Sequence, residues 1–241
     1  MTALADNTPC FVLHIRPYRN TSVIADVFSR EYGRTGIVFR GVKASRKNPK
    51  SRLLQPFQPL ALSWRGKGEL KSGRTIEADG TAFFLRGKSL YSGLYLNELL
   101  TRLLFNDDPY PLLYADYTRC LASLLKTAEI EVPLRIFEMK LLENLGYPLP
   151  LHVDALTGNP IDDTINYRYD PEVGFYNQEV MSRKPDQPVF SGKLLSAMAC
   201  EDFSTLTIRR GAKQLMRTVL AFHLDNKPLR SRHLFNNQYK E

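Results

Sequence analysis

The spacing of apolar residues changes near Gly80, and this change limits the fold more than any other sequence feature. Before that residue, apolar positions alternate with polar ones, as they do in half-buried β-strands. Beyond it they recur every three to four residues, as they do on one face of an α-helix. The sequence therefore predicts an α+β chain, with an all-β module over residues 1–80 and a mostly helical domain over residues 81–241.

The first 80 residues contain five segments with the composition of short strands. Phe11, Leu13 and Ile15 lie at alternate positions of the first segment, and Gly33–Gly36 is expected to form a hairpin turn into the third. The other four strands are expected at 22–29, 37–42, 60–64 and 69–78. Five short strands with glycine-containing connections are typical of a small closed barrel of the OB type. An SH3-like barrel would produce nearly the same pattern.

The helical part has an interruption in its middle. Residues 148–188 are rich in Asp, Asn, Pro and Gly, and we expect an irregular insert with a hairpin and a short strand at 164–169. We expect aromatic side chains to pack inside this insert and hold it together: Tyr147, Tyr167, Tyr169, Phe175 and Tyr176. Helices are expected from Leu96 onward and at 112–128, 132–144, 192–199 and 205–224.

Positive charge is concentrated in the predicted barrel. Ten basic residues and a single acid, Glu69, lie between Arg40 and Arg74, and residues 44–51 have the composition of a long flexible loop. A phosphate backbone is recognised by such clusters, because each neutralised phosphate releases counterions. The alternative is a solvated loop that happens to be basic. We predict DNA contacts at Arg40, Lys43, Arg46, Lys47, Lys50 and Arg52, extended by Arg65, Lys67 and Lys71.

Two further features could bind a partner. Trp64 could stack on a base, but it shares a strand face with Leu60 and Leu62, so we assign it to the core. On the last long helix, Arg210, Lys213 and Arg217 follow a helical spacing beside the apolar face of Ile208, Ala212, Leu215, Val219 and Phe222. This basic stripe is either a solvated face or a docking site for an acidic peptide or DNA.

The residues required by the common classes of enzyme are missing from the sequence. The four histidines have no metal-type spacing with one another or with cysteine, and there is neither a P-loop nor a G-x-S-x-G motif. We therefore predict a protein without catalytic activity, cofactor or metal. An unrecognised metal-dependent nuclease remains an alternative.

The charge balance and the cysteines indicate the kind of partner and the cellular compartment of the chain. Lys and Arg number 33 against 25 Asp and Glu, and the net charge of +8 favours polyanionic partners. Three widely separated cysteines do not make a disulfide framework and fit a reducing compartment. The sequence also contains no apolar stretch long enough to span a membrane. We expect a cytoplasmic protein with no membrane contact.

Several stretches, taken in order, resemble the RecO family of bacterial DNA repair proteins along nearly the whole chain. They are residues 11–17 (FVLHIRP), 33–41, 54–60 (LQPFQPL), 65–71 (RGKGELK), 90–100 (LYSGLYLNELL), 134–147 (LRIFEMKLLENLGY), 160–169 (PIDDTINYRY) and 227–235 (KPLRSRHLF). The resemblance implies an OB barrel, a central helical bundle and a small zinc-binding or zinc-like insert. It also implies a mediator of the RecF pathway that binds single- and double-stranded DNA and anneals complementary strands.

The resemblance also implies partners. With RecR, such a protein helps RecA to displace the single-stranded-DNA-binding protein SSB, whose acidic-aromatic C-terminal tail binds the helical part. Arg135, within the LRIFE stretch, is the first candidate for the tail site, followed by Arg210 and Lys213. Many family members carry a CxxC…CxxC zinc site in the insert, but no cysteine lies between Cys120 and Cys200 here. The resemblance is therefore closest to the zinc-free branch. An OB module that binds RNA without annealing remains the alternative function.

Overall fold

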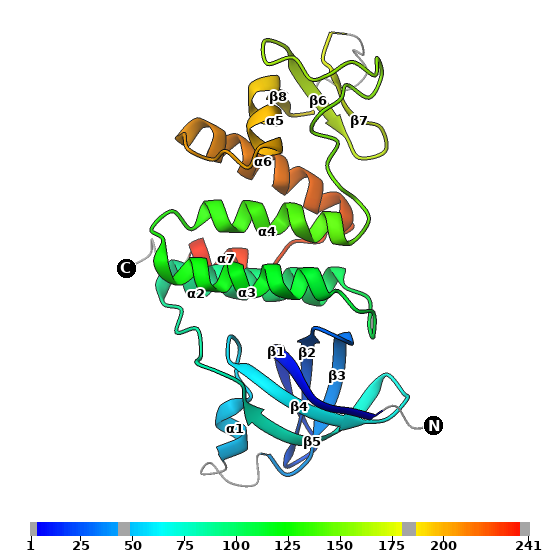
Figure 1. Ribbon diagram of the computed structural model, residues 1–241, viewed down its shortest axis with the longest axis vertical. Helices are drawn as coiled ribbons and strands as arrows, with labels where there is room; N and C mark the ends of the chain where they lie inside the picture. Colours follow the sequence, from blue (N-terminus) through cyan, green and yellow to red (C-terminus); the bar gives the residue numbers. More distant parts are fainter. Residues whose placement is uncertain (1–3, 43–48, 180–186, 237–241) are drawn as a thin grey trace. The chain divides into compact units, whose positions relative to one another are not determined.

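The computed structural model describes residues 4–42, 49–179 and 187–236, which form two compact units (Figure 1). The first unit contains the described residues up to Ile130 and those from Leu229 onward, and the second is Glu131–Pro228. The change from strands to helices lies inside the first unit. Its elements are β1 (Leu4–Tyr18), β2 (Ser22–Ser29), β3 (Gly33–Phe39), α1 (Pro49–Leu53), β4 (Pro59–Arg65), β5 (Leu70–Ala78), α2 (Gly87–Leu103), α3 (Pro111–Lys126) and α7 (Arg232–Asn236).

The five strands close into a barrel in the order β1-β2-β3-β5-β4. All neighbouring strands are antiparallel except β3 and β5, which pair in parallel. This arrangement is OB-like, so the predicted OB barrel and the α+β class are confirmed. Trp64 is buried in the barrel core, where its ring lies edge-on to Tyr32, as its strand position predicts.

The turn between β2 and β3 differs from the sequence prediction. Ser29 pairs with Gly33, so the turn consists of residues 30–32 and Gly33–Gly36 belongs to β3. Gly33 has a φ of +60°, and a Cβ there would lie 1.6 Å from the carbonyl oxygen of Asp108. Gly33 is therefore required by the close approach of the α2–α3 loop and by its left-handed backbone.

The first strand is buried on both faces in its central part, whereas the alternating pattern predicts one exposed face. Cys10 and Val12 belong to the barrel core, while the Phe11 ring contacts Tyr114 and Tyr117 of α3. Both α2 and α3 pack against the outside of the barrel (Figure 1). Because these helices cover it, the outer face of the strand is apolar as well.

A buried polar contact joins the barrel to both helices. Asn97 of α2 donates from Nδ2 to the carbonyl of Leu13 (3.0 Å), and its Oδ1 accepts from the Tyr117 hydroxyl (2.6 Å). All three residues are buried, and hydrogen bonding lowers the cost of placing these polar groups away from water. Asn97 therefore links β1 to both helices through buried hydrogen bonds.

Two helices of the first unit differ from the prediction: α2 begins earlier than expected, and α1 was not expected. The second helix begins at Gly87 rather than Leu96, because its first turns lack a continuous apolar stripe. Residues 49–51, placed in the predicted flexible loop, begin helix α1. The remainder of that loop, from Ala44 to Asn48, lies outside the described residues.

The second unit consists of α4 (Glu131–Asn144), a three-stranded sheet, α5 (Gly192–Ala199) and α6 (Leu206–His223). The sheet has the order β7-β6-β8, with β6 Asn166–Asp170, β7 Gly174–Asn177 and β8 Val189–Ser191. Helix α6 packs against α4 and α5, and its N-cap is Thr205, which accepts from the backbone N–H of Ile208. The expected helix at 205–224 is confirmed within one residue at each end.

Aromatic side chains fill the insert as predicted, with one exception. Tyr167, Tyr169, Phe175 and Tyr176 are buried, and the Tyr169 and Phe175 rings lie 5.0 Å apart. Tyr147 is 58% exposed and lies against His223 instead. It follows Gly146, whose φ of +85° ends α4, so the chain has already turned away from the helix at this point.

The end of the described chain returns to the first unit. There Glu98 of α2 accepts hydrogen bonds from the backbone N–H groups of Arg230 (2.9 Å) and Ser231 (2.8 Å) and from the Ser231 hydroxyl (2.6 Å). The ring of Phe235 in α7 lies 5.7 Å from that of Tyr91. One glutamate thus holds the turn that precedes α7.

Candidate nucleic-acid interface

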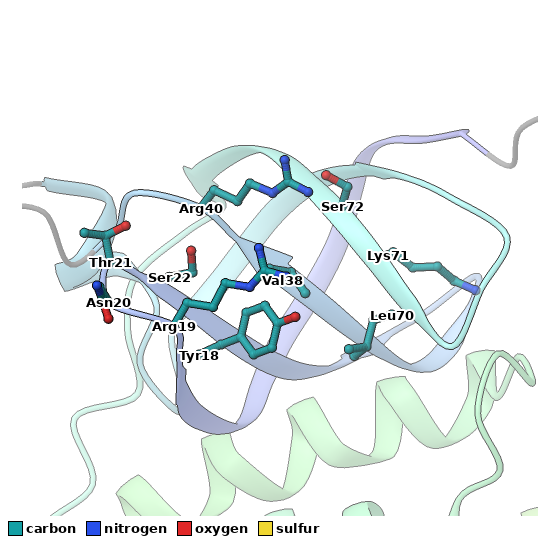
Figure 2. Close-up of a pocket in the computed structure, with 10 residues that line it drawn as sticks. All are labelled: Tyr18, Arg19, Asn20, Thr21, Ser22, Val38, Arg40, Leu70, Lys71 and Ser72. Carbon is teal, nitrogen blue, oxygen red and sulfur yellow. The ribbon is translucent and has the colours of Figure 1, made fainter.

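A groove of about 790 Å³ opens on the barrel surface where the β1–β2 turn faces the β3–β5 pair (Figure 2). It is lined by Tyr18, Arg19, Asn20, Thr21, Ser22, Val38, Arg40, Leu70, Lys71 and Ser72. Three of these described lining residues are cationic and none is acidic. OB folds bind nucleic acids on the strand 2–3 face and the neighbouring loops, so the groove lies on the expected side of the barrel.

Arg19 and Arg40 supply the accessible charge of the groove. Both side chains are exposed, and neither forms an ion pair within residues 4–42, 49–179 and 187–236. Arg19 lies in the β1–β2 turn, and Arg40 directly follows β3. Two exposed guanidinium groups that line one groove can each bind one phosphate.

Four more of the predicted DNA contacts are exposed on the first unit: Lys50 and Arg52 of α1, Arg65 at the end of β4, and Lys67 in the following turn. Lys43, Arg46 and Lys47 lie outside the described residues. The exposed cations therefore extend over α1 and the β4–β5 turn as well as the groove.

Lys71 is placed differently from the others. It lies on β5 opposite Ile37, is 8% exposed, and donates from Nζ to Asp107 Oδ2 (2.7 Å) and to the Gly68 carbonyl (2.9 Å). Its side chain points away from Tyr18 in the close-up (Figure 2). Because Asp107 already neutralises this ammonium, we assign Lys71 a structural role and not a contact with phosphate.

Sequence reasoning missed the β1–β2 turn. Tyr18, Arg19 and Asn20 contribute a ring, a cation and an amide to the groove, yet a single arginine is not conspicuous beside the Arg40–Arg74 cluster. The available signal was the Tyr-Arg-Asn-Thr segment, because it connects the first two strands of an expected OB barrel, where ligand-binding loops lie.

The second unit contains the predicted peptide-binding cations, in different environments. Arg210 is exposed, and Lys213 donates to Glu131 Oε1 at 2.7 Å. Partial burial raises the pKa of Glu131, but the hydrogen bond and charge of Lys213 and the charges of Arg135 and Arg209 outweigh it and lower the pKa overall. Arg135 is 6% exposed and pairs with the fully buried Glu138 at 2.6 Å.

The apolar face of α6 matches its prediction except at its C-terminal end. Ile208, Ala212, Leu215 and Val219 are buried, but Phe222 is 46% exposed. Phe222 lies edge-on to His223, and burial lowers the pKa of that imidazole. An accessible aromatic ring, that of Phe222, therefore lies at the C-terminal end of α6.

Comparison with known proteins accounts for almost the whole chain. Residues 1–80 match the family described as Recombination protein O N terminal, and residues 86–233 match Recombination protein O C terminal. DNA repair protein RecO of Photobacterium profundum is 42% identical over 226 residues, covering 94% of both chains. The RecO proteins of Haemophilus influenzae and Klebsiella pneumoniae are also 42% identical, covering 93% of this chain and 93% and 90% of their own.

The chain belongs to the RecO family. Its OB-like barrel is thus the N-terminal part of a DNA repair protein, and the predicted family is confirmed. No helix among the described residues is both long and apolar enough to cross a membrane.

The described residues of the insert do not form a set of ligands that fits a zinc ion. No three His, Cys, Asp or Glu side chains come together in the described part of the chain, and the insert contains no cysteine. A carboxylate fixes the turn of the insert instead: Asp154 accepts from the backbone N–H groups of Leu156 (2.9 Å), Thr157 (3.1 Å) and Asn177 (3.0 Å). The turn and β7 are therefore joined through one side chain.

Proposed function

We propose that this RecO-family chain is a non-enzymatic mediator of DNA repair and recombination. It binds single- and double-stranded DNA, anneals complementary strands, and acts with RecR to load RecA onto DNA coated by SSB, in the cytoplasm at the nucleoid. The family and the fold support the general role in DNA repair.

The observation that carries the proposal is the groove, whose described lining combines exposed Arg19 and Arg40 with no acidic residue. Arg40, Lys50, Arg52, Arg65 and Lys67 remain the proposed DNA contacts among the described residues, together with Arg19. Lys43, Arg46 and Lys47 are proposed from the sequence alone. Lys71 supports the shape of the groove through its contact with Asp107.

Annealing requires no bond chemistry. Two polyanions repel each other, and a surface that neutralises part of both charges lowers this repulsion. Cations at the groove can hold one strand, while those on α1 and the β4–β5 turn can hold the second. Strand pairing then proceeds by base complementarity alone.

The SSB tail is acidic and ends in an aromatic residue, so its site needs a cation beside an apolar surface. Arg210 meets this requirement best, because it is exposed on α6. Lys213 shares its charge with Glu131, and Arg135 is enclosed with Glu138. We therefore place Arg210 first, with Lys213 and Arg135 as weaker candidates.

The deciding experiment is annealing of complementary oligonucleotides coated by the cognate SSB, at several salt concentrations and without nucleotide. Wild type should accelerate pairing, and an Arg19→Ala, Arg40→Ala, Lys50→Ala variant should lose most of that acceleration. Lys193→Ala, which removes an exposed cation from the second unit, is the matched control. Folded protein that binds DNA without accelerating annealing would contradict the mediator role. Tighter binding to single-stranded RNA would favour the RNA-binding alternative.

A further inference from the structure

An aromatic ring lies inside the cationic groove. Tyr18, the last residue of β1, is partly exposed and lines the groove beside Arg19 and Arg40. The Arg19 guanidinium lies over the ring, 5.3 Å from its centroid, and Figure 2 shows the two side chains alongside each other. A flat, polarised stack of this kind offers a surface to another flat aromatic group.

The backbone holds this pair in a defined position. Tyr18 pairs with Ser22 across the turn, and Arg19 has a φ of +50°, in the left-handed region that non-glycine residues rarely adopt. Such a conformation costs free energy and is maintained only when the surrounding structure fixes it. The turn therefore presents Arg19 to the groove in a set orientation.

Other lining residues supply polar groups suited to the remainder of a nucleotide. Val38 of β3 pairs with Ser72 of β5. The exposed Arg40 lies two residues after Val38, directly beyond the end of β3. Arg40 can bind a phosphate, whereas Ser72 and Asn20 can exchange hydrogen bonds with base edges. The groove volume of about 790 Å³ falls within the usual range of small-molecule sites.

We propose that this groove binds one unpaired base of a single strand, stacked on the Tyr18–Arg19 pair, with its phosphate on Arg40. The inference rests on the proposed DNA-binding function and specifies which form of DNA the groove takes. In a duplex both faces of each base are covered by neighbours, so only an unpaired base can reach Tyr18. Duplex DNA is held by the surrounding cations without this contact.

The test compares three ligands by fluorescence anisotropy at one salt concentration: a single-stranded oligonucleotide of about ten nucleotides, an abasic strand of equal length, and a duplex. Wild type should prefer the normal strand to the abasic strand by about tenfold, or about 1.4 kcal/mol, because one base stacks on the Tyr18–Arg19 pair. Tyr18→Ala should remove that preference and leave duplex affinity unchanged. Tyr18→Phe should retain it, and Tyr147→Ala, which alters an exposed tyrosine of the second unit, is the matched control.

The outcomes separate this inference from the proposed function. If wild type binds none of the ligands, the proposed function fails and the inference with it. If wild type binds DNA but Tyr18→Ala keeps the preference for bases, only the base site is wrong. An equal loss of single-strand and duplex affinity in a folded Tyr18→Ala variant would also overturn it, since Tyr18 would then contact both forms of DNA alike.

Discussion

At the scale of single residues, Arg135 and Glu138 form a buried ion pair. The guanidinium and carboxylate are 2.6 Å apart on successive turns of α4. Arg135→Met alone should lower the free energy of unfolding by about 3 to 5 kcal/mol, because it leaves the Glu138 charge buried without its arginine. Adding Glu138→Leu should restore most of that loss, because the charge is then gone.

Urea denaturation of the two variants checks this prediction, and the double variant also serves the SSB question. If Arg135→Met is as stable as wild type, the pair carries no structural role. A folded double variant that binds an SSB tail peptide with wild-type affinity would remove Arg135 from the tail site. Loss of binding in the single variant alone would reflect altered folding.

Asp154 is a second residue whose charge is tied to the fold. Burial raises its pKa, but the backbone N–H groups of Thr157, Leu156 and Asn177 stabilise the carboxylate and lower the pKa overall. A carboxyl with a depressed pKa in the folded state stabilises the protein above its unfolded pKa of about 3.9. That stability is lost as the pH falls through the folded value.

Asp154→Asn should therefore destabilise the second unit by about 1 to 3 kcal/mol at pH 7. The difference from wild type should begin to shrink below about pH 4, where the unfolded aspartate takes up a proton, and should disappear as the pH falls through the folded pKa. Denaturation curves between pH 3 and 7, on the order of one pH unit apart, check both statements. Asp225→Asn, which changes an exposed aspartate of the same unit, should leave stability unchanged. A constant difference between wild type and Asp154→Asn at all pH values would contradict the proposed role of the charge.

At the scale of elements, the contact between α2 and the chain end depends on Glu98. Burial raises the pKa of this carboxyl, but the Ser231 and Arg230 hydrogen bonds and the Arg102 charge lower it overall. Glu98→Ala removes all three acceptor contacts, so α7 should detach from α2 at a cost of about 1 to 3 kcal/mol.

Hydrogen exchange of the Arg230 and Ser231 amides is the direct measurement for Glu98→Ala. Faster exchange there, with unchanged exchange in the barrel strands, is the expected result. Because the folded pKa is depressed, wild type should show the same local opening as the pH falls below about 4. Glu77→Ala, on the exposed side of β5, is the control. Unchanged protection in Glu98→Ala would mean that the Phe235–Tyr91 contact alone holds α7.

The order of elements could be predicted from sequence because each depends on local periodicity. Residues 22–29 and 192–199 coincide with β2 and α5, and both have a clear apolar pattern with marked ends. The burial of β1 on both faces could not be predicted in this way, since it depends on α2 and α3 folding back over the barrel. A long-range contact of this kind also changes the role that we assign to Lys71 in the groove. Lys71 is neutralised by Asp107, 36 residues away, and this pairing has no local signature.

At the scale of the whole molecule, the surplus of positive charge determines how DNA binding responds to salt. Exposed cations lie on the barrel surface, with Arg19 and Arg40 in its groove, and on the α6 stripe of the second unit. Only cations that touch phosphates release counterions, so the slope of log affinity against log salt counts contacts rather than net charge. A charge removed from the groove and one removed elsewhere should therefore have different effects.

Arg19→Ala and Arg40→Ala should each flatten the slope for single-stranded DNA by about 0.7, and the double variant by about twice that amount. Lys193→Ala changes the net charge as much as either single variant but lies on α5 and does not line the groove, so it should leave the slope unchanged. Anisotropy titrations between about 50 and 200 mM salt measure these slopes. Equal flattening by all three single variants would show that overall charge governs binding.

The effect of Arg19→Ala and Arg40→Ala on the slope should also be independent of base sequence, because phosphate contacts carry no sequence information. A slope change confined to one base composition would place Arg19 and Arg40 against bases instead.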